Sequence, residues 1–337
     1  MRLSKLLWAS LAIFSLQSST SMAEIGQHSI PPRVKLTLLG TGGGAAFINP
    51  ERAQPANLLT VDGRHYLVDA GEGVSQQLAT AGVQPSSVSA VFLTHLHFDH
   101  IAGLAPFLGF LWTSGHSAGV DILGPHGTNE FVSAAIQYLR EPLDLYARQL
   151  PPAPPIAALV KVQEFGEQGP QRIFADDRVS VSAVENTHFT TIPWKRRDMR
   201  ARSYALRFDV GSRSIVFTGD TGPSDAVARL AKGADVLVAE VLDIEGGAAL
   251  LRQHFQGRPD QLAKTIDHVR KEHLSPEAVG QMAAQAGVKT VVLTHIGSTK
   301  PGQTDYSRYT EGVRKFFHGE VVVGKDLASL DLTERPD

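Results

Sequence analysis

Four side chains that commonly bind metal ions lie within six consecutive residues: His95, His97, Asp99 and His100. Neutral imidazole nitrogens and carboxylate oxygens are donors that Zn²⁺, Fe and Mn accept. The chain contains no cysteine, which excludes thiolate ligands, disulfide bonds and a cysteine nucleophile. The spacing therefore predicts a metal site held by nitrogen and oxygen atoms.

The elements that must position this cluster follow one pattern, in which an apolar strand stops at a chemically active side chain. The predicted strand at residues 88–94 runs into His95. The later strands, at 179–184, 214–217, 234–239 and 289–293, lead to His188, Asp220, Glu240 and His295. Because open α/β sheets gather their sites at the carboxyl ends of strands, we expect the five ends to converge on one site.

Turn signals divide the rest of the chain into further elements. Asp62-Gly63 and Gly211-Ser212 are typical of hairpin turns. The Gly-rich run at 40–44 follows a strand but lacks the Lys and Ser/Thr of a phosphate-binding loop, so we interpret it as a turn that lets the backbone approach the site. Helices are predicted at 101–112, 128–139 and 276–286, and a proline-rich loop at 142–155.

The composition bounds the class of protein. The 337 residues are 42% hydrophobic and 20% charged, as in an ordinary globular protein. The net charge of −2 gives no electrostatic footprint for nucleic-acid binding. Arg2 and Lys5 precede an apolar run at 6–16, and small residues flank Met22, so we predict a cleaved signal peptide at 1–23. One domain at 24–337, periplasmic or secreted and without a membrane attachment after cleavage, is expected.

The combined motif resembles the metallo-β-lactamase-fold hydrolases. It comprises His95-Leu96-His97-Phe98-Asp99-His100, His188, Asp220 in Thr-Gly-Asp-Thr and His295 in Leu-Thr-His. The resemblance extends from about residue 34 to residue 332. It implies an α/β (α+β) fold, a four-layer αβ/βα sandwich of two mixed β-sheets with helices on the outer faces.

The resemblance also implies two metal ions, Zn²⁺ or else Mn or Fe. His95, His97 and His188 would hold one ion, and Asp99, His100 and His295 the other. Asp220 would bridge the two. Two cations lower the pKa of the water between them, so the implied nucleophile is a metal-bound hydroxide, which Asp99 would also orient.

A second motif, residues 271–276, resembles the His-Ser motif of the tRNA 3′-processing endonuclease tRNase Z and of its relatives among arylsulfatases and phosphodiesterases. It implies that His273 is a general acid that protonates the leaving oxygen and that Glu240 orients it. The alternative is a surface histidine at the start of a helix. Ser275 is predicted to be an N-cap.

The substrate is less constrained by the sequence. A basic stretch, which could contact an anionic ester or be a solvated connection, comprises Lys195, Arg196, Arg197, Arg200 and Arg202. The long Gly/Pro-rich arm with which the tRNA enzyme grips its substrate is not found. A small anionic ester is therefore the expected partner, and nucleic acid is not.

We therefore expect an exported dinuclear metal hydrolase of sulfate or phosphate esters, of the arylsulfatase or phosphodiesterase type. The alternatives within enzymes are a tRNase Z-like phosphodiesterase or nuclease, a lactonase and a β-lactamase. A non-catalytic metal-binding protein is the alternative from another class. The oligomeric state stays open, with a homodimer among the options.

Overall fold

A computed structural model describes residues 31–44, 49–115, 119–166, 169–193, 201–297 and 302–334. These residues belong to one unit, Pro31–Asp337. The predicted signal peptide at 1–23 lies outside the described residues, as do the basic residues at 195–197 and Arg200. The domain boundary at residue 24 and the export of the chain stay predictions. Within the described ranges, no helix combines the length and apolar character needed to cross a membrane.

Two seven-stranded mixed sheets form the centre of the fold. The first has the strand order β14-β1-β2-β3-β4-β5-β6, with β1 (Val34–Gly40), β2 (Ala56–Val61), β3 (Arg64–Val68), β4 (Val88–Phe92), β5 (Val120–Pro125), β6 (Val160–Phe165) and β14 (Ser329–Asp331). Its strands β3 to β6 run parallel. The predicted hairpin around Asp62-Gly63 is confirmed as β2 and β3.

The second sheet has the strand order β13-β12-β11-β10-β9-β8-β7. Its strands are β7 (Gln171–Ala175), β8 (Ser180–Glu185), β9 (Tyr204–Val210), β10 (Arg213–Phe217), β11 (Val236–Leu242), β12 (Thr290–Gly297) and β13 (Glu320–Val323). The hairpin predicted around Gly211 is confirmed as β9 and β10. Strands β10 to β13 run parallel, so their carboxyl ends meet at one edge.

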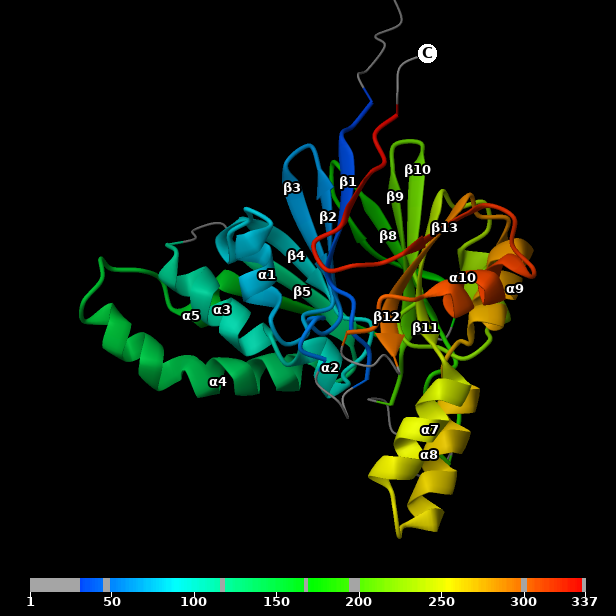
Figure 1. The fold of residues 1–337 in the computed structure, drawn as a ribbon. Helices are drawn as coiled ribbons and strands as arrows, with labels where there is room; N and C mark the ends of the chain where they lie inside the picture. The colour runs from blue at the N-terminus through cyan, green and yellow to red at the C-terminus, as the bar shows by residue number, and fades with distance from the viewer. Residues whose placement is uncertain are drawn as a thin grey trace, which may run out of the picture. The chain divides into compact units, whose positions relative to one another are not determined.

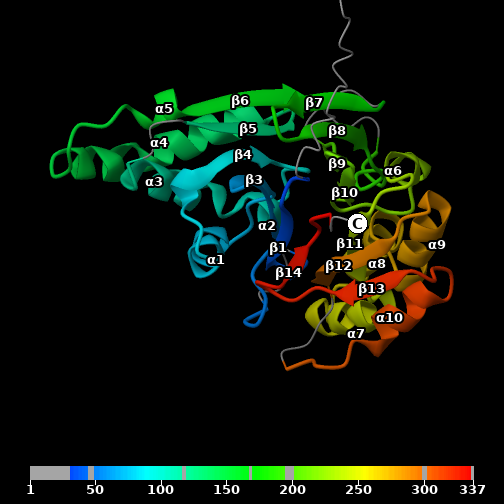
Figure 2. The ribbon, with the colours of Figure 1, turned by 90° about the horizontal axis from the view of Figure 1, so that it is seen from above.

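Helices cover the outer face of each sheet (Figure 2). Beside the first sheet are α1 (Val74–Thr80), α2 (Phe98–Ile101), α3 (Leu104–Thr113), α4 (Thr128–Ala147), α5 (Ile156–Leu159) and the 3₁₀ turn η1 (Pro85–Ser87). Beside the second are α6 (Asp225–Leu230), α9 (Pro276–Ala286) and α10 (Ser307–Arg314), whereas α7 (Ile244–His254) and α8 (Pro259–Glu272) lie beyond the end of β11 (Figure 1). The predicted αβ/βα sandwich is confirmed.

The core consists of three apolar clusters, which match the layers. One lies between the sheets, where the rings of Phe92 and Phe208 meet edge to face with centroids 5.1 Å apart. The other two lie between each sheet and its own helices. Burial of these side chains is the main force that holds the layers together.

The helical segments differ from prediction in two places. The helix expected at 101–112 is divided at Gly103, where the N–H donates to the Ala70 carbonyl at 2.8 Å and a Cβ would lie 2.2 Å from the carbonyl oxygen of Gly71. Helix α4 continues through Pro142 to Ala147, where a loop was expected. Leu139 and Leu143 are both buried, so the apolar stripe of the helix persists beyond the proline and its packing outweighs the lost hydrogen bond.

The helical hairpin α7–α8 was not predicted. It leaves the second sheet after β11 and returns to it through Leu274, and Figure 1 shows both helices beyond the end of β11. The Asp243 carboxylate caps α7 by accepting from the Gly246 N–H at 3.1 Å, and Pro259 occupies the first turn of α8. The hairpin therefore begins and ends next to Glu240 and His273.

Candidate metal centre

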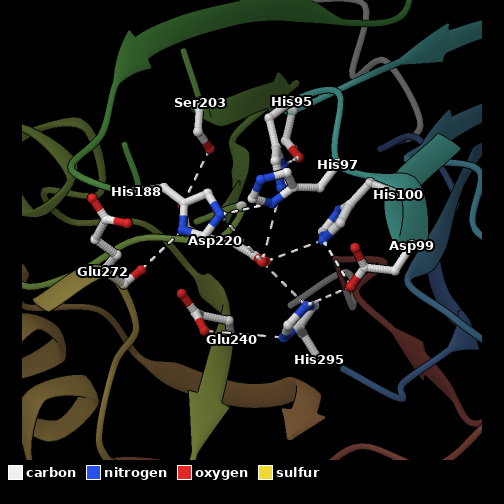
Figure 3. A network of polar contacts seen from close by, with 12 residues as sticks. His95, His97, Asp99, His100, His188, Ser203, Asp220, Glu240, Glu272 and His295 are labelled. Carbon is white, nitrogen blue, oxygen red and sulfur yellow. Dashed lines mark hydrogen bonds and ion pairs between the residues drawn. The ribbon is translucent and has the colours of Figure 1, made fainter. Parts of the chain in front are cut away.

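All seven predicted metal ligands lie together where the two sheets bring their strand ends (Figure 3). They form two groups. The first consists of His95, His97, His188 and Asp220, and the second of Asp99, His100 and His295; within each group the potential ligand atoms lie within 4.8 Å of one another. The resemblance implies the same two sets of ligands, except that Asp220, which belongs to the first group here, is there a bridge between the two ions. The five strand ends thus converge as expected.

Asp220 lies between the two groups. Its Oδ1 atom is 3.2 Å from His100 Nε2, and its Oδ2 atom is 3.2 Å from His295 Nε2. The same Oδ2 atom is 3.9 Å from His95 Nε2 and 3.9 Å from His188 Nε2. One carboxylate therefore reaches both histidine groups, as a bridging ligand must.

Several buried atoms at this centre lack hydrogen-bond partners among the described residues. They are His95 Nε2, His100 Nε2, Asp220 Oδ1 and both ring nitrogens of His295. Buried polar atoms are normally paired, because an unpaired one costs about 1–3 kcal/mol. Inward-facing imidazole and carboxylate atoms without partners fit divalent cations that accept nitrogen and oxygen donors.

The local backbone explains how a short segment supplies four ligands. Strand β4 ends at Phe92, and His97 has extended dihedrals (φ −67°, ψ 148°) before the single turn α2 begins. That turn places Asp99 and His100 on consecutive helical positions, with both side chains buried. The change from strand to turn places the two halves of the motif in different groups of potential ligands, so that each half would bind a different ion.

The Gly-rich turn reaches the centre from the opposite side. A Cβ at Gly43 would lie 2.4 Å from His295 Nδ1, so only glycine fits there. His295 itself has a φ of 45°, which is a strained conformation for a histidine. The predicted role of this turn, close approach of backbone to the site, is confirmed.

Asp69 supports the centre and was missed by the sequence prediction. Its carboxylate accepts from the Thr94 N–H at 2.8 Å, from the Thr94 hydroxyl at 2.9 Å and from His100 Nδ1 at 2.8 Å. With Nδ1 donating to Asp69, the Nε2 atom of His100 is the one that would bind a metal ion. Asp69 follows β3, so the strand-end pattern contained the signal that would have found it.

Glu272 is a second supporting residue that was missed. Its backbone carbonyl accepts from His188 Nδ1 at 3.0 Å, which leaves Nε2 of His188 for a metal. Its buried carboxylate accepts from the Thr191 N–H and from His268 Nδ1. Glu272 directly precedes His273 and so belongs to the motif at residues 271–276, but nothing in the sequence indicated that it contacts His188.

The predicted pair of His273 and Glu240 is formed. Glu240 Oε2 lies 2.7 Å from His273 Nδ1, and Glu240 Oε1 accepts from the Thr221 N–H at 2.5 Å. The His273 side chain is only 11% exposed, so it is not a surface histidine. Its ring lies 4.9 Å from that of His188 and 6.0 Å from that of His295, beside the metal centre.

The electrostatics of the site suit metal binding. Burial lowers the pKa of His95 and of His188 well below the ordinary value, which keeps both rings in the neutral form that binds a cation. Burial alone would raise the pKa of Asp220, but the neighbouring charges of His295 and His100 outweigh it and hold that pKa well below its usual value. Asp220 is thus an anion ready to bridge.

In the His273–Glu240 pair, the pKa values of both residues are raised. Burial raises the pKa of Glu240. Burial would lower the pKa of His273, but the charge of Glu240 and the hydrogen bond to it raise that pKa above its ordinary value. The carboxylate of Glu240 therefore favours the protonated form of His273, which is the form that a proton donor requires.

The remaining predicted residues have structural roles. Ser275 is confirmed as an N-cap, because its hydroxyl accepts from the Ala278 N–H. Arg202, the one described member of the basic stretch, pairs with Glu185 at 2.7 Å.

Solved structures share this fold. A metallo-β-lactamase fold protein, YhfI from Bacillus subtilis, aligns with a TM-score of 0.63 at 21% identity, over 89% of this chain and 99% of that chain. The short form of human tRNase Z aligns with a TM-score of 0.61 at 20% identity, over 88% and 98% of the two chains. At these identities the likeness concerns the fold alone.

A curated relative corrects two expectations. Ribonuclease Z from Mycobacterium bovis (strain BCG / Pasteur 1173P2) is 32% identical over 309 residues, which are 90% of this chain and 99% of the relative. The predicted arylsulfatase-type function is therefore wrong, and so is the expectation that nucleic acid is not a partner. The ligand set could not separate sulfate from phosphate esters, and a net charge of −2 describes the whole chain rather than the field at its site.

A family model confirms the resemblance that the ligand motifs carry. The model of the beta-lactamase superfamily domain matches residues 64–296, which are more than half of the chain and include all seven ligand positions. With the layered fold and the clustered ligands, this match establishes that the chain belongs to the metallo-β-lactamase-fold superfamily.

Proposed function

We propose that the chain is a metal-dependent phosphodiesterase of the ribonuclease Z type, with RNA as its substrate. The observation that carries the proposal is the buried His273–Glu240 pair beside the seven metal ligands, with 2.7 Å between His273 Nδ1 and Glu240 Oε2. An alkoxide leaving group, such as a ribose oxygen, needs a proton donor of this kind. The 32% identity to a ribonuclease Z over almost its full length supports RNA as the substrate.

The seven ligands would hold two cations. When bound, such ions activate water as a nucleophile and neutralise charge that develops on the phosphate. Zn²⁺ is the first choice, with Mn or Fe as alternatives, because every donor is nitrogen or oxygen. Asp220 would hold the two ions together, and Asp99, with Oδ2 at 3.5 Å from His295 Nε2, would orient the attacking water.

The proton step belongs to His273. As the P–O bond to the leaving oxygen breaks, His273 gives its Nε2 proton to that oxygen and becomes neutral. Its Nδ1–H remains bonded to Glu240, which fixes the tautomer and the orientation of the ring. Glu240 lies on strand β11, and its carboxylate also accepts from the Thr221 N–H. These two constraints hold the carboxylate, and with it the His273 ring, in a fixed position.

Purified protein loaded with Zn²⁺ or Mn²⁺ tests the proposal. The substrates are a tRNA precursor with a 3′ extension, an unstructured RNA and bis-p-nitrophenyl phosphate. We expect cleavage of RNA phosphodiesters, abolished in Asp220→Asn. Metal-loaded, folded protein that cleaves none of the three would overturn the proposal. Cleavage of the unstructured RNA at the rate of the precursor would retain the ribonuclease and remove tRNA as its particular substrate.

A further inference from the structure

A second histidine–glutamate pair lies beside the first. His268 Nδ1 is 2.5 Å from Glu272 Oε2, and the Glu272 side chain is 1% exposed. The His268 ring centroid is 5.5 Å from that of His273 and 5.7 Å from that of His188. Unlike the first pair, it is open to solvent, because 36% of the His268 side chain is exposed. The pair therefore lies beside the metal ligand His188, at a position that solvent reaches.

Glu272 fixes which nitrogen of His268 can meet a ligand. The carboxylate accepts from His268 Nδ1–H and from the Thr191 N–H, so it is anchored on both sides. Its backbone carbonyl also orients His188, which ties the pair to the metal ligands. The Nε2 atom of His268 is left on the other edge of the ring, where a neutral imidazole offers a hydrogen-bond acceptor.

A phosphate oxygen, which can only accept, pairs with Nε2 only when that atom carries a proton. Among the parts of a nucleic acid that lie next to a scissile bond, the ribose 2′-hydroxyl is both a donor and an acceptor. It can therefore pair with Nε2 whether or not the imidazole is protonated. The ligand that fits His268 is a hydroxyl beside the leaving oxygen.

We propose that His268 Nε2 binds the 2′-hydroxyl of the nucleotide whose 3′-oxygen leaves, so that the enzyme prefers ribose to deoxyribose at that position. The inference rests on the proposed function, in which His273 protonates the leaving oxygen. O2′ and O3′ are on adjacent carbons of one ribose, and two imidazoles with centroids 5.5 Å apart can contact these two oxygens at once. Glu272 is the positioning residue for His268, as Glu240 is for His273.

Matched RNA substrates with one cleavage site test this contact. They differ only at the nucleotide on the 5′ side of the scissile phosphate, which carries a 2′-hydroxyl, a 2′-hydrogen or a 2′-fluorine. The fluorine keeps a ribose-like sugar pucker but has no hydrogen to donate. One neutral hydrogen bond predicts a value of kcat/KM about 3- to 10-fold higher for the hydroxyl than for either analogue. The same changes on the 3′ side of the phosphate should have no such effect.

The variants assign the preference to its residue. His268→Ala and His268→Gln should lower kcat/KM on the ribose substrate and leave kcat/KM on the deoxyribose substrate unchanged. In His268→Ala, the ratio of kcat/KM on ribose to that on deoxyribose should therefore approach one. His254→Ala, at the far end of α7, is the control and should keep the wild-type ratio. Thermal melting and metal content check that each variant is folded and loaded.

The outcomes separate the two proposals. RNA cleavage with equal rates on ribose and deoxyribose overturns the role of His268 but not the proposed function, as does a preference that persists in His268→Ala. A preference that appears on the 3′ side instead also overturns it. Wild-type protein that cleaves no phosphodiester, bis-p-nitrophenyl phosphate included, overturns both.

Discussion

His273 Nδ1 lies 2.7 Å from Glu240 Oε2, although the two residues are 33 positions apart in the sequence. Glu240 belongs to β11, and His273 directly follows α8. The contact depends on the return of the chain through a helical hairpin to the strand it left. The two residues therefore form one functional unit that neither segment could supply alone.

Replacement of His273 by Ala should slow cleavage most for substrates with poor leaving groups, which must be protonated as they depart. General acid catalysis typically contributes about 10²–10⁴-fold, so we expect a loss of that order in kcat on RNA. The loss on bis-p-nitrophenyl phosphate should be much smaller, because p-nitrophenolate departs without a proton. Single-turnover rates on both substrates measure this. Equal losses would show that His273 is not the acid, and exposed His318 provides the control substitution.

Replacement of Asp220 by Asn should reduce the metal content from two ions to one or fewer per chain. Asn keeps the size of the side chain but removes the negative charge that lies 3.2 Å from both His100 Nε2 and His295 Nε2. Metal analysis after dialysis measures the effect, with Asp225→Asn on α6 as the control. Retention of two tightly bound ions in Asp220→Asn would contradict the bridging role.

Replacement of Asp69 by Asn should weaken metal binding without removing a ligand. Loss of an outer carboxylate partner of a ligating histidine typically costs about 10–100-fold in metal affinity. Here the affected ligand is His100, whose Nδ1 would lose its charged acceptor at 2.8 Å. Chelator titration measures this, with exposed Asp260→Asn as the control. Unchanged affinity would show that the Asp69 carboxylate is not needed to hold the His100 ring in place.

The ligands could be predicted from the sequence because each follows an apolar strand. The same pattern contained Asp69, which follows β3, but the sequence prediction gave this carboxylate no role at the site. Glu272 and His268 could not be found in this way, because they lie on α8, which has a polar exposed face and no strand before it. Their position depends on how α8 packs beside Thr191, a contact between segments 81 positions apart.

The hairpins within the two sheets could be predicted from the sequence, whereas the edge strand β14 could not. The hairpins β2–β3 and β9–β10 have local turns with Gly63 and Gly211, so their pairing is encoded within a few residues. Strand β14 pairs with β1 from the far end of the chain, and its three residues give no periodic pattern. Such an edge strand is determined by the surface it covers and not by its own sequence.

Asp176 provides a stability prediction that is independent of the metal centre. It follows β7 of the second sheet and accepts from the Tyr66 hydroxyl at 2.6 Å and from Arg64 at 2.9 Å, both on β3 of the first sheet. It also accepts from the Arg178 and Val179 N–H groups at 2.8 Å each. Asp176→Asn should therefore lower the free energy of unfolding at pH 7 by about 1–3 kcal/mol.

The effect of Asp176 should depend on pH. Burial would raise the pKa of Asp176, but the hydrogen bond from Tyr66 and those from the Val179 and Arg178 N–H groups outweigh it and lower that pKa. A lowered pKa in the folded state means that the stabilisation is present above the unfolded pKa, about 3.9, and is lost as pH falls through the folded value. Urea unfolding at pH 7 and pH 3 measures the difference between Asp176→Asn and wild type, which should shrink at the lower pH.

A matched control separates this carboxylate from its neighbour. Asp177 also contacts Arg64, but its side chain is 65% exposed, so Asp177→Asn should change stability much less. An equal loss in the two variants would attribute the effect to Arg64 alone. An Asp176→Asn deficit that is the same at both pH values would contradict the ionised role of the carboxylate.

The hairpin α7–α8 is closed at its base by one backbone hydrogen bond, from the Leu242 N–H to the Leu274 carbonyl at 2.9 Å. Leu242 lies two residues beyond Glu240, and Leu274 follows His273, so this bond joins the two sides of the acid pair. The connection between α7 and α8, at residues 255–258, lies at the opposite end of the hairpin from this bond, so its length can change with little effect on the acid pair. Substrate preference can therefore diverge at the tip of the hairpin while the residues at its base, Glu272 and His273, are retained.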